Sequence, residues 1–122
     1  EFQLERGGQW MKGKCCPTFG PLGPWLVTPD KAGNPQNLNL WLELNGKRVQ
    51  NSNTSDMIFS LAHIVSYVSQ FMIIEPGDII TTGTPEGVGM GMDPQRFLKP
   101  GDEMRVGIEN LGEQHQKVQA CS

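Results

Sequence analysis

Leucine occupies every second position between Leu38 and Leu44, and polar or amphipathic residues fill the positions between. Such alternation predicts a strand with one buried face. Asn45-Gly46 follows, and extended residues resume over 47–50. Because Asn-Gly favours the positive φ angles of a two-residue hairpin turn, the two stretches are predicted to pair as a β-hairpin.

A second pattern, with helical spacing, covers residues 61–72. Apolar side chains recur three and four positions apart, and polar ones fall on the opposite face. Ser60 stands directly before the pattern and is a favoured N-cap residue. We therefore expect one amphipathic helix over 61–72, packed on the sheet.

Two Pro-Gly-Asp sequences, at 76–78 and 100–102, indicate turns that lead into strands. The β-branched residues 79–82 follow the first turn and are predicted to form a short strand. A strand over 103–109, a turn at 110–112 and a return strand over 114–119 are predicted after the second. One or two helices among six or seven strands give a mainly β domain of the α+β class.

Residues 9–24 are rich in glycine and proline, and we expect an irregular but packed loop there. The chain has three tryptophans, Trp10, Trp25 and Trp41. Tryptophans at strand or loop positions favour the core, although the same side chains could line a pocket.

The 122 residues form a single domain, 1–122, with room for one hydrophobic core. The net charge of −3 with 19 % charged residues leaves no basic stripe, so nucleic acid is not an expected partner. The apolar run Phe71–Ile74 is far shorter than the ~20 residues of a membrane span, and no signal peptide opens the chain. We expect a cytoplasmic location with no membrane partner. Cys15, Cys16 and Cys121 match neither a disulfide framework nor a zinc spacing and are expected to be reduced.

The segment after the first Pro-Gly-Asp turn carries the clearest candidate chemistry. Glycines at 83, 87, 89 and 91 allow positive φ and a close backbone approach to a ligand. Pro85 stiffens the loop, and the Thr84 hydroxyl adds a donor, so a carboxylate or phosphate could be bound. The alternative is a loop that only connects strands. No Gly-Lys-Ser/Thr follows Gly83, which excludes a nucleotide phosphate-loop.

Several motifs occur in an order that resembles the C-terminal half of the catalytic domain of fumarylacetoacetate hydrolase family proteins. The match runs through Pro-Gly-Asp at 76–78, Thr-Gly-Thr-Pro at 82–85, Gly-Val-Gly at 87–89 and Lys-Pro-Gly-Asp at 99–102. It also includes Gln3, Gly13-Lys14, Thr18, Gly23-Pro24-Trp25, Gln50 and Ser69. The resemblance extends over nearly the whole chain.

The resemblance implies a mixed, rolled β-sheet, here incomplete, in a protein that is a homodimer or higher oligomer. It also implies a small 2-oxo acid substrate and a divalent cation, commonly Mg²⁺, with Mn²⁺ or Ca²⁺ as alternatives. Such a cation chelates the carboxylate and keto oxygens and stabilises the enolate that forms when a carbon–carbon bond breaks. The stretches at 7–10 and 111–116 resemble members that hydrolyse 2,4-dioxo-3-deoxy-sugar acids and others named ureidoglycolate lyase.

Site residues follow by position in the resemblance. Lys14 aligns with the catalytic lysine that neutralises a developing oxyanion, and Gln3 with a substrate-contacting glutamine. Thr18 aligns with a threonine near the metal. Thr84, between Gly83 and Pro85, aligns with the threonine that holds the substrate carboxylate.

The carboxylates that bind the metal in the family, a Glu-x-Glu pair and two aspartates, precede the segment that this chain matches. We therefore expect this chain alone to bind no metal. Two functions remain open. The chain could be part of a metal-dependent hydrolase or lyase of 2-oxo or 2,4-dioxo acids. Alternatively, it could be a catalytically silent, self-associating domain that binds a small carboxylate or nothing.

Overall fold

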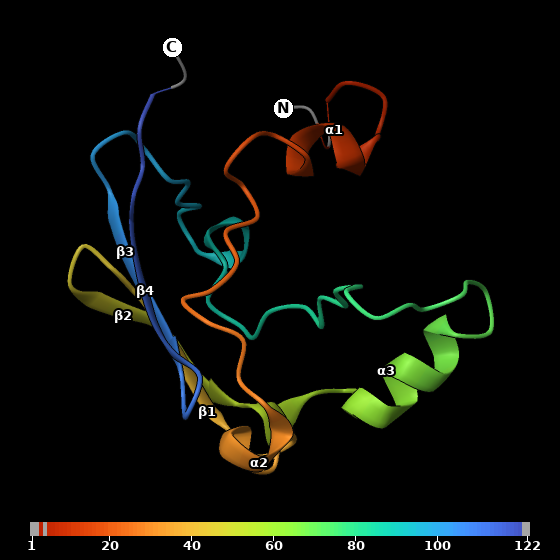
Figure 1. Cartoon of the computed structure of the whole chain (residues 1–122). Coiled ribbons are helices and arrows are strands. Elements are labelled where there is room, and N and C mark those ends of the chain that lie inside the picture. The colour runs from red at the N-terminus through yellow and green to blue at the C-terminus, as the bar shows by residue number, and fades with distance from the viewer. Residues whose placement is uncertain (1–2, 4, 121–122) are drawn as a thin grey trace.

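A four-stranded antiparallel sheet is the largest unit of regular structure and lies at one side of the molecule, on the left in Figure 1. The computed structural model describes residue 3 and residues 5–120. The strands are β1 (Asn39–Leu44), β2 (Lys47–Asn53), β3 (Glu103–Ile108) and β4 (Gly112–Lys117), in the order β2-β1-β3-β4. β1 pairs with β3 although the two strands lie about sixty residues apart in the sequence, so the sheet holds the two hairpins together.

Both predicted hairpins are confirmed. Asn45 and Gly46 have φ angles of 52° and 76°, the double positive of the turn that their sequence favours. The second hairpin turns through Asn110 and Gly112, which also have positive φ. The strand boundaries lie within two residues of their predictions, except that β2 continues to Asn53, three residues beyond its predicted end at 50.

The register separates an apolar face of the sheet from a charged face. Leu42 lies opposite Gln50 on β2 and Val106 on β3, whereas Glu43 lies opposite Arg48 and Arg105. Side chains alternate between faces along a strand, so the leucines share one side with Val106. Leu44 at 6 % exposure is part of the small buried core, together with Leu38 and Ala32.

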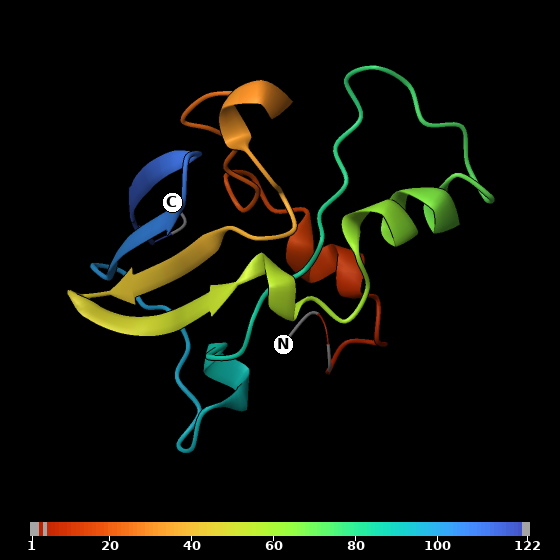
Figure 2. The same cartoon turned by 90° about the horizontal axis from the view of Figure 1, so that it is seen from below.

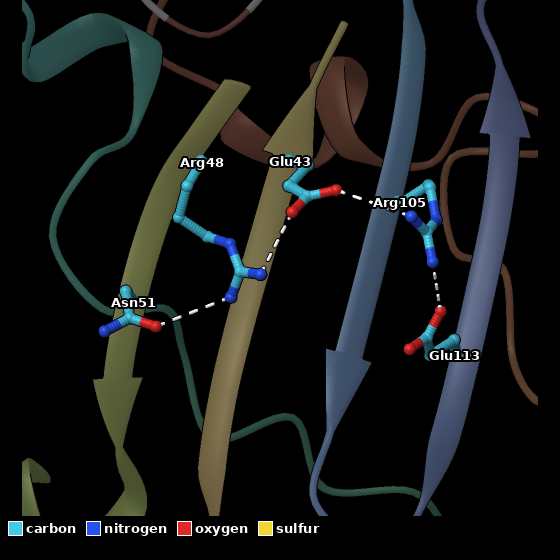
Figure 3. Close-up of polar contacts among 5 residues, drawn as sticks. All are labelled: Glu43, Arg48, Asn51, Arg105 and Glu113. Atoms are coloured by element: carbon cyan, nitrogen blue, oxygen red, sulfur yellow. Dashed lines mark hydrogen bonds and ion pairs between the residues drawn. The ribbon is translucent and has the colours of Figure 1, made fainter. Parts of the chain in front are cut away.

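A row of alternating charges crosses the other face (Figure 3). Arg48 Nη2 donates to Glu43 Oε1 at 3.0 Å, Arg105 Nη1 lies 3.6 Å from Glu43 Oε2, and Arg105 Nη2 donates to Glu113 Oε2 at 2.7 Å. Both guanidinium groups also lie over the Trp41 ring, 4.3 Å and 5.6 Å from its centroid. These contacts neutralise the charged face within the sheet.

Helix α3 (Leu61–Val68) is shorter than predicted and stands apart from the sheet (Figures 1 and 2). The Ser60 hydroxyl accepts the His63 N–H, which confirms the expected N-cap. The predicted end at 72 is wrong, because the backbone bonds after Val68 tighten to i→i−3 contacts such as Phe71 N–H to Val68 O. Packing on the sheet is also wrong, since α3 projects to the opposite side of the molecule from the strands.

Short helical segments that the sequence did not predict complete the fold. Helix α1 (Trp10–Lys14) lies within the segment 9–24 that was expected to be irregular. Of the glycines in that segment only Gly13 falls inside the helix, so the others do not interrupt it. Helix α2 (Pro29–Ala32) follows Thr28, with proline at its first position. Single 3₁₀ turns, η1 (Thr54–Asp56) and η2 (Gly89–Gly91), complete the elements.

The predicted strand over 79–82 is wrong. Residues 79–88 belong to no strand, because no neighbouring backbone in the described part of the chain pairs with them. Within residue 3 and residues 5–120 there are four strands, not six or seven, and all pair antiparallel. The mainly β class with few helices is confirmed.

Both Pro-Gly-Asp turns are built in the same way. The Asp78 carboxylate accepts the Glu75 N–H at 2.8 Å, and the Asp102 carboxylate accepts the Lys99 N–H at 2.9 Å. Asp102 additionally accepts a bond from the Asn45 side chain at 2.8 Å. The bond from Asn45, followed by that from the Lys99 backbone, holds the pKa of Asp102 below its usual value.

None of the helices described is long and apolar enough to cross a membrane.

Candidate functional site

The glycine-rich loop is fastened to the apolar side of the sheet by one side chain. Gln50 Nε2 lies 3.0 Å from Thr84 Oγ1, 3.1 Å from the Pro85 carbonyl oxygen and 3.1 Å from that of Glu86. Gln50 is in β2, opposite Leu42. The loop is therefore positioned by the sheet, although it does not itself form a strand.

A bulge in β2 brings the loop backbone still closer. Leu42 pairs with Gln50 and Glu43 with Arg48, so Val49 is an extra residue on β2. A Cβ atom at Gly87 would collide with the Val49 carbonyl oxygen, and Gly87 has a φ of 95°. The glycine is thus required twice, by its conformation and by the space that it leaves.

The loop presents two kinds of donor: the Thr84 hydroxyl, which makes one long bond of 3.4 Å to the Pro85 carbonyl oxygen, and backbone N–H groups. Thr84 is exposed, and no acceptor in the described part of the chain takes the N–H of Thr84, Glu86 or Gly87. Hydroxyl and backbone N–H donors on a glycine-rich loop are suited to an oxyanion. The geometry agrees with the carboxylate-binding role predicted for Thr84, between Gly83 and Pro85, but nothing in it identifies a ligand.

The structure brings Gln3 and Lys14 to one place but not to the loop. Gln3 lies against Gly13, whose added Cβ would come within 2.6 Å of the Gln3 side chain, and Lys14 is the next residue. Lys14 Nζ lies 5.5 Å from the centre of the Trp10 ring. Among the described residues, no hydrogen bond or ion pair joins Gln3 or Lys14 to residues 83–85. Their predicted roles stay predictions.

Thr18 has an unusual backbone conformation. The Phe19 N–H donates to the Cys16 carbonyl oxygen at 3.2 Å, and Pro17 and Thr18 are the central residues of this turn. Thr18 has a φ of 68°. A β-branched residue in the left-handed region costs about 1–3 kcal/mol, and such strain is concentrated at functional sites. The metal-proximal role implied for Thr18 is compatible with this strain but is not tested by it.

A wide apolar pocket of about 790 Å³ lies between the apolar face of β3 and the segment 22–27. Gln114, on β4, donates to the Gly23 carbonyl oxygen and fixes that segment. Trp25 lines the pocket with 63 % of its surface exposed, and Trp10 is exposed as well. The core prediction is therefore wrong for these two tryptophans, because so little of the described chain covers them; Trp41 is half-buried.

The described residues offer no cluster of three or more His, Cys, Asp or Glu side chains that could hold a metal ion. The residues present thus do not fit a divalent cation by themselves. Cys15 and Cys16 are free thiols, and Cys121 lies outside the described residues.

Gln50 is the functional candidate that the sequence did not single out. It belonged to the motif match, but no role was assigned to it. Its position gave no signal, because regular alternation after the Asn45-Gly46 turn would place Val49 opposite Leu42 and Gln50 on the other face. The bulge at Val49 turns Gln50 to the leucine side, where a polar side chain needs a partner.

Comparison with known proteins identifies close relatives. A Burkholderia cenocepacia (strain HI2424) protein, provisionally named a hydrolase, is 59 % identical over 119 residues, which are 97 % of this chain and 42 % of the relative. The chain thus spans about two-fifths of the length of the curated relatives it matches.

Solved structures share the fold. A fumarylacetoacetate hydrolase from Exiguobacterium antarcticum has a TM-score of 0.86 at 39 % identity, over 90 % of this chain and 39 % of that one. Maleylpyruvate hydrolase from Sphingobium sp. SYK-6, in complex with manganese(II) and pyruvate, has a TM-score of 0.76 at 37 % identity, over 84 % of this chain and 36 % of that one. A 2-hydroxyhepta-2,4-diene-1,7-dioate isomerase from Mycobacterium marinum has a TM-score of 0.83 at 38 % identity, over 97 % of this chain and 43 % of that one.

The family comparison agrees with both sets of relatives. The sequence model described as fumarylacetoacetate (FAA) hydrolase C-terminal matches residues 1–119, almost the entire chain. This chain belongs to the fumarylacetoacetate hydrolase family and corresponds to its C-terminal region.

Proposed function

We propose that this chain supplies the carboxylate-binding part of an enzyme that acts on a small 2-oxo or 2,4-dioxo acid. The observation that carries the proposal is the loop at 83–87, which Gln50 holds on the sheet. In the described structure its N–H groups at 84, 86 and 87 have no acceptor, and the Thr84 hydroxyl makes a long bond of 3.4 Å to the Pro85 carbonyl oxygen. Relatives named as hydrolases and isomerases of such acids support the substrate class.

In this proposal the chain's own groups bind and orient the substrate. The Thr84 hydroxyl and the adjacent N–H groups donate to the substrate carboxylate. The Lys14 ammonium faces the oxygen on which negative charge develops, with Gln3 beside it, as the resemblance implies. Lys14 is exposed and next to Gly13, the residue that Gln3 contacts, so the two can act as one unit.

The manganese(II) ion bound to maleylpyruvate hydrolase supports a divalent cation in the family. Mg²⁺, Mn²⁺ or Ca²⁺ would keep the 2-oxo acid in its chelating form. The described residues do not form a cation site, so we assign the ligands of the cation to parts of the protein that lie outside them.

Titration calorimetry of the native protein with pyruvate in the presence of Mn²⁺ tests the proposal. Thr84→Val keeps the shape of the side chain and removes the hydroxyl. Loss of one hydrogen bond to a carboxylate should weaken pyruvate binding roughly 10- to 100-fold. Thr81→Val, another exposed threonine of the same segment, is the control and should bind as wild type.

Lys14→Met tests the proposed interaction of the Lys14 ammonium with the developing oxyanion. An interaction made mainly with developing charge should lower kcat more than it raises KM. Equal effects on both would assign Lys14 to ground-state binding instead.

The silent alternative makes a different prediction. A self-associating domain without catalysis would turn over no 2-oxo acid, whether it binds a small carboxylate such as pyruvate or nothing, and would still form a dimer or higher oligomer. Exposed apolar side chains, such as Ile58 at 93 %, support association in either case. Sedimentation at several concentrations measures it directly.

A further inference from the structure

We propose that Gln50 is a positioning residue that orients the donors of the loop at 84–87 toward an anionic ligand. This inference rests on the proposed carboxylate-binding function for its ligand, but its structural part can be tested separately. Gln50 itself does not touch the substrate. It acts by fixing which groups of the loop point toward the sheet and which point away from it.

The two carbonyl contacts determine the orientation of the Gln50 amide. The oxygens of Pro85 and Glu86 can only accept, and both lie 3.1 Å from the same atom of Gln50. That atom must therefore be the NH₂ nitrogen. Its two hydrogens are shared among three acceptors, since Thr84 Oγ1 is also 3.0 Å away.

The same contacts determine the direction of two backbone N–H groups. The peptide bonds after Pro85 and Glu86 are trans, because the cis bonds of the chain lie elsewhere. In a trans peptide the C=O and the N–H of the following residue point in opposite directions. Holding the carbonyls of Pro85 and Glu86 on Gln50 therefore turns the N–H groups of Glu86 and Gly87 away from it.

The Thr84 hydroxyl is oriented by the same logic. An amide nitrogen has no lone pair to accept a hydrogen bond, so Thr84 Oγ1 can only accept from Gln50. The hydroxyl hydrogen is directed to the Pro85 carbonyl oxygen at a long 3.4 Å, a weak bond that an anion can replace. One side chain in this way prepares three donors, the Thr84 hydroxyl and the N–H groups of Glu86 and Gly87, for an anion on the far side of the loop.

The bulge at Val49 and the glycine at 87 support this reading. The Val49 carbonyl oxygen occupies the space where a Gly87 side chain would be, so the loop approaches β2 at the residue next to Gln50. Bulges commonly redirect side chains beside functional sites. The sheet, the bulge and the Gln50 amide together determine which polar groups of the loop face β2 and which face away from it.

Gln50→Met and Gln50→Glu test the inference in the native protein. Met keeps the length of the side chain and removes the donors. Glu keeps the shape but places an acceptor against two carbonyl oxygens, and it can take the Thr84 hydroxyl hydrogen for itself. Gln36→Met is the matched control, because Gln36 also links two segments, donating to Thr54 O at 2.7 Å and accepting from Leu61 N–H at 2.9 Å, but contacts no loop residue.

The first measurement needs no ligand. In protein with labelled threonine methyl groups, the NMR order parameter of Thr84 should fall clearly in Gln50→Met and stay unchanged in Gln36→Met, even if both variants lose stability. An unchanged Thr84 order parameter in Gln50→Met would overturn the inference, whatever the ligand experiments give.

The second measurement is pyruvate affinity in the presence of Mn²⁺. Gln50→Met should bind about tenfold more weakly and Gln50→Glu about a hundredfold, while Gln36→Met binds as wild type. Combining Gln50→Met with Thr84→Val should give less than the product of the two single effects, since Gln50 acts partly through Thr84. Fully multiplicative effects, or wild-type affinity in Gln50→Met, would overturn the assignment.

The two proposals fail in distinguishable ways. If Thr84 becomes mobile in Gln50→Met but wild-type protein binds no pyruvate, the positioning role stands and the proposed function is wrong. If wild-type protein binds pyruvate and Gln50→Met binds it equally well, the proposed function stands and the role of Gln50 is wrong.

Discussion

The four-stranded sheet and the segment over 57–98 are held in place by different means. In the sheet every strand is hydrogen-bonded to a neighbour, and Leu44 is 6 % exposed. The segment is similarly apolar, yet Ile73 is 86 % exposed. Its position depends on a few anchors, chiefly the Gln50 amide and the Gln36 side chain, which accepts the Leu61 N–H. The difference shows that apolar residues alone do not bury a segment. Burial also requires backbone pairing with a neighbouring strand or a complementary surface to pack against.

The largest expected effect tests this difference directly. Leu44→Ala removes a buried side chain from the sheet and should lower the free energy of unfolding by about 3 kcal/mol. Ile73→Ala deletes comparable apolar surface in the segment and should change it by less than about 0.5 kcal/mol. Urea denaturation of both variants measures the two values, and equal losses would show that the segment contributes to the same core.

A pair of glycines with almost identical backbone conformations tests the anchoring of the loop. Gly83 and Gly87 have φ angles of 94° and 95°, but only Gly87 lies against other backbone atoms. Gly83→Ala should cost about 1 kcal/mol for conformation alone. Gly87→Ala adds the collision with Val49 and should cost about 2–3 kcal/mol. Thermal unfolding compares them, and similar losses would mean that the loop does not depend on its approach to β2.

Thr18 extends the comparison to the N-terminal segment. Thr18→Gly relieves the positive φ and should raise the free energy of unfolding by about 1 kcal/mol. If the strain serves the site, the same variant should lose activity. Calorimetry and turnover of one preparation measure both; a less stable variant would show that the Thr18 side chain makes compensating contacts.

The smallest expected effect concerns pH and the second Pro-Gly-Asp turn. The pKa of Asp102 is lowered in the folded protein by the Asn45 side chain and the Lys99 N–H. Its stabilising contribution is therefore fully present above the unfolded pKa of about 3.9 and is lost as pH falls through the folded pKa. NMR titration should place the Asp102 midpoint below that of an ordinary aspartate. In Asn45→Ala the midpoint should move upward, and an unmoved midpoint would assign the shift to another cause.

Local sequence signals predicted the sheet. Asn45-Gly46 determines the turn, and the alternating leucines determine which face is buried, so the first hairpin needed no distant information. The same holds for the Ser60 N-cap. Thr28-Pro29, an N-cap residue followed by proline, was an available signal for α2 that the sequence analysis did not use.

Features that depend on distant contacts were not predicted. Residues 79–82 have strand-forming side chains, but a strand also requires a paired neighbour, and sequence preference cannot supply one. The helical pattern continues to Met72, whereas the backbone leaves the α-helix after Val68. The Ser69 hydroxyl donates to the Ser66 carbonyl oxygen at this point, a local bond that competes with helical pairing.

The candidate site divides along the same line. Thr84 and its glycines were found from spacing and resemblance, because the loop's chemistry lies in consecutive residues. The role of Gln50 could not be found in that way, since its partners lie 34 to 36 positions away in the sequence.

The bulge at Val49 has an evolutionary consequence. Removing this one residue would leave Arg48 and Gln50 on the same opposite faces of the sheet that they occupy now, so the deletion is compatible with the strand pairing. It would also withdraw the carbonyl oxygen that excludes a side chain at position 87. Among homologues, a gap at 49 would therefore remove one of the two requirements for glycine at 87, while the positive φ of 95° would still favour glycine there.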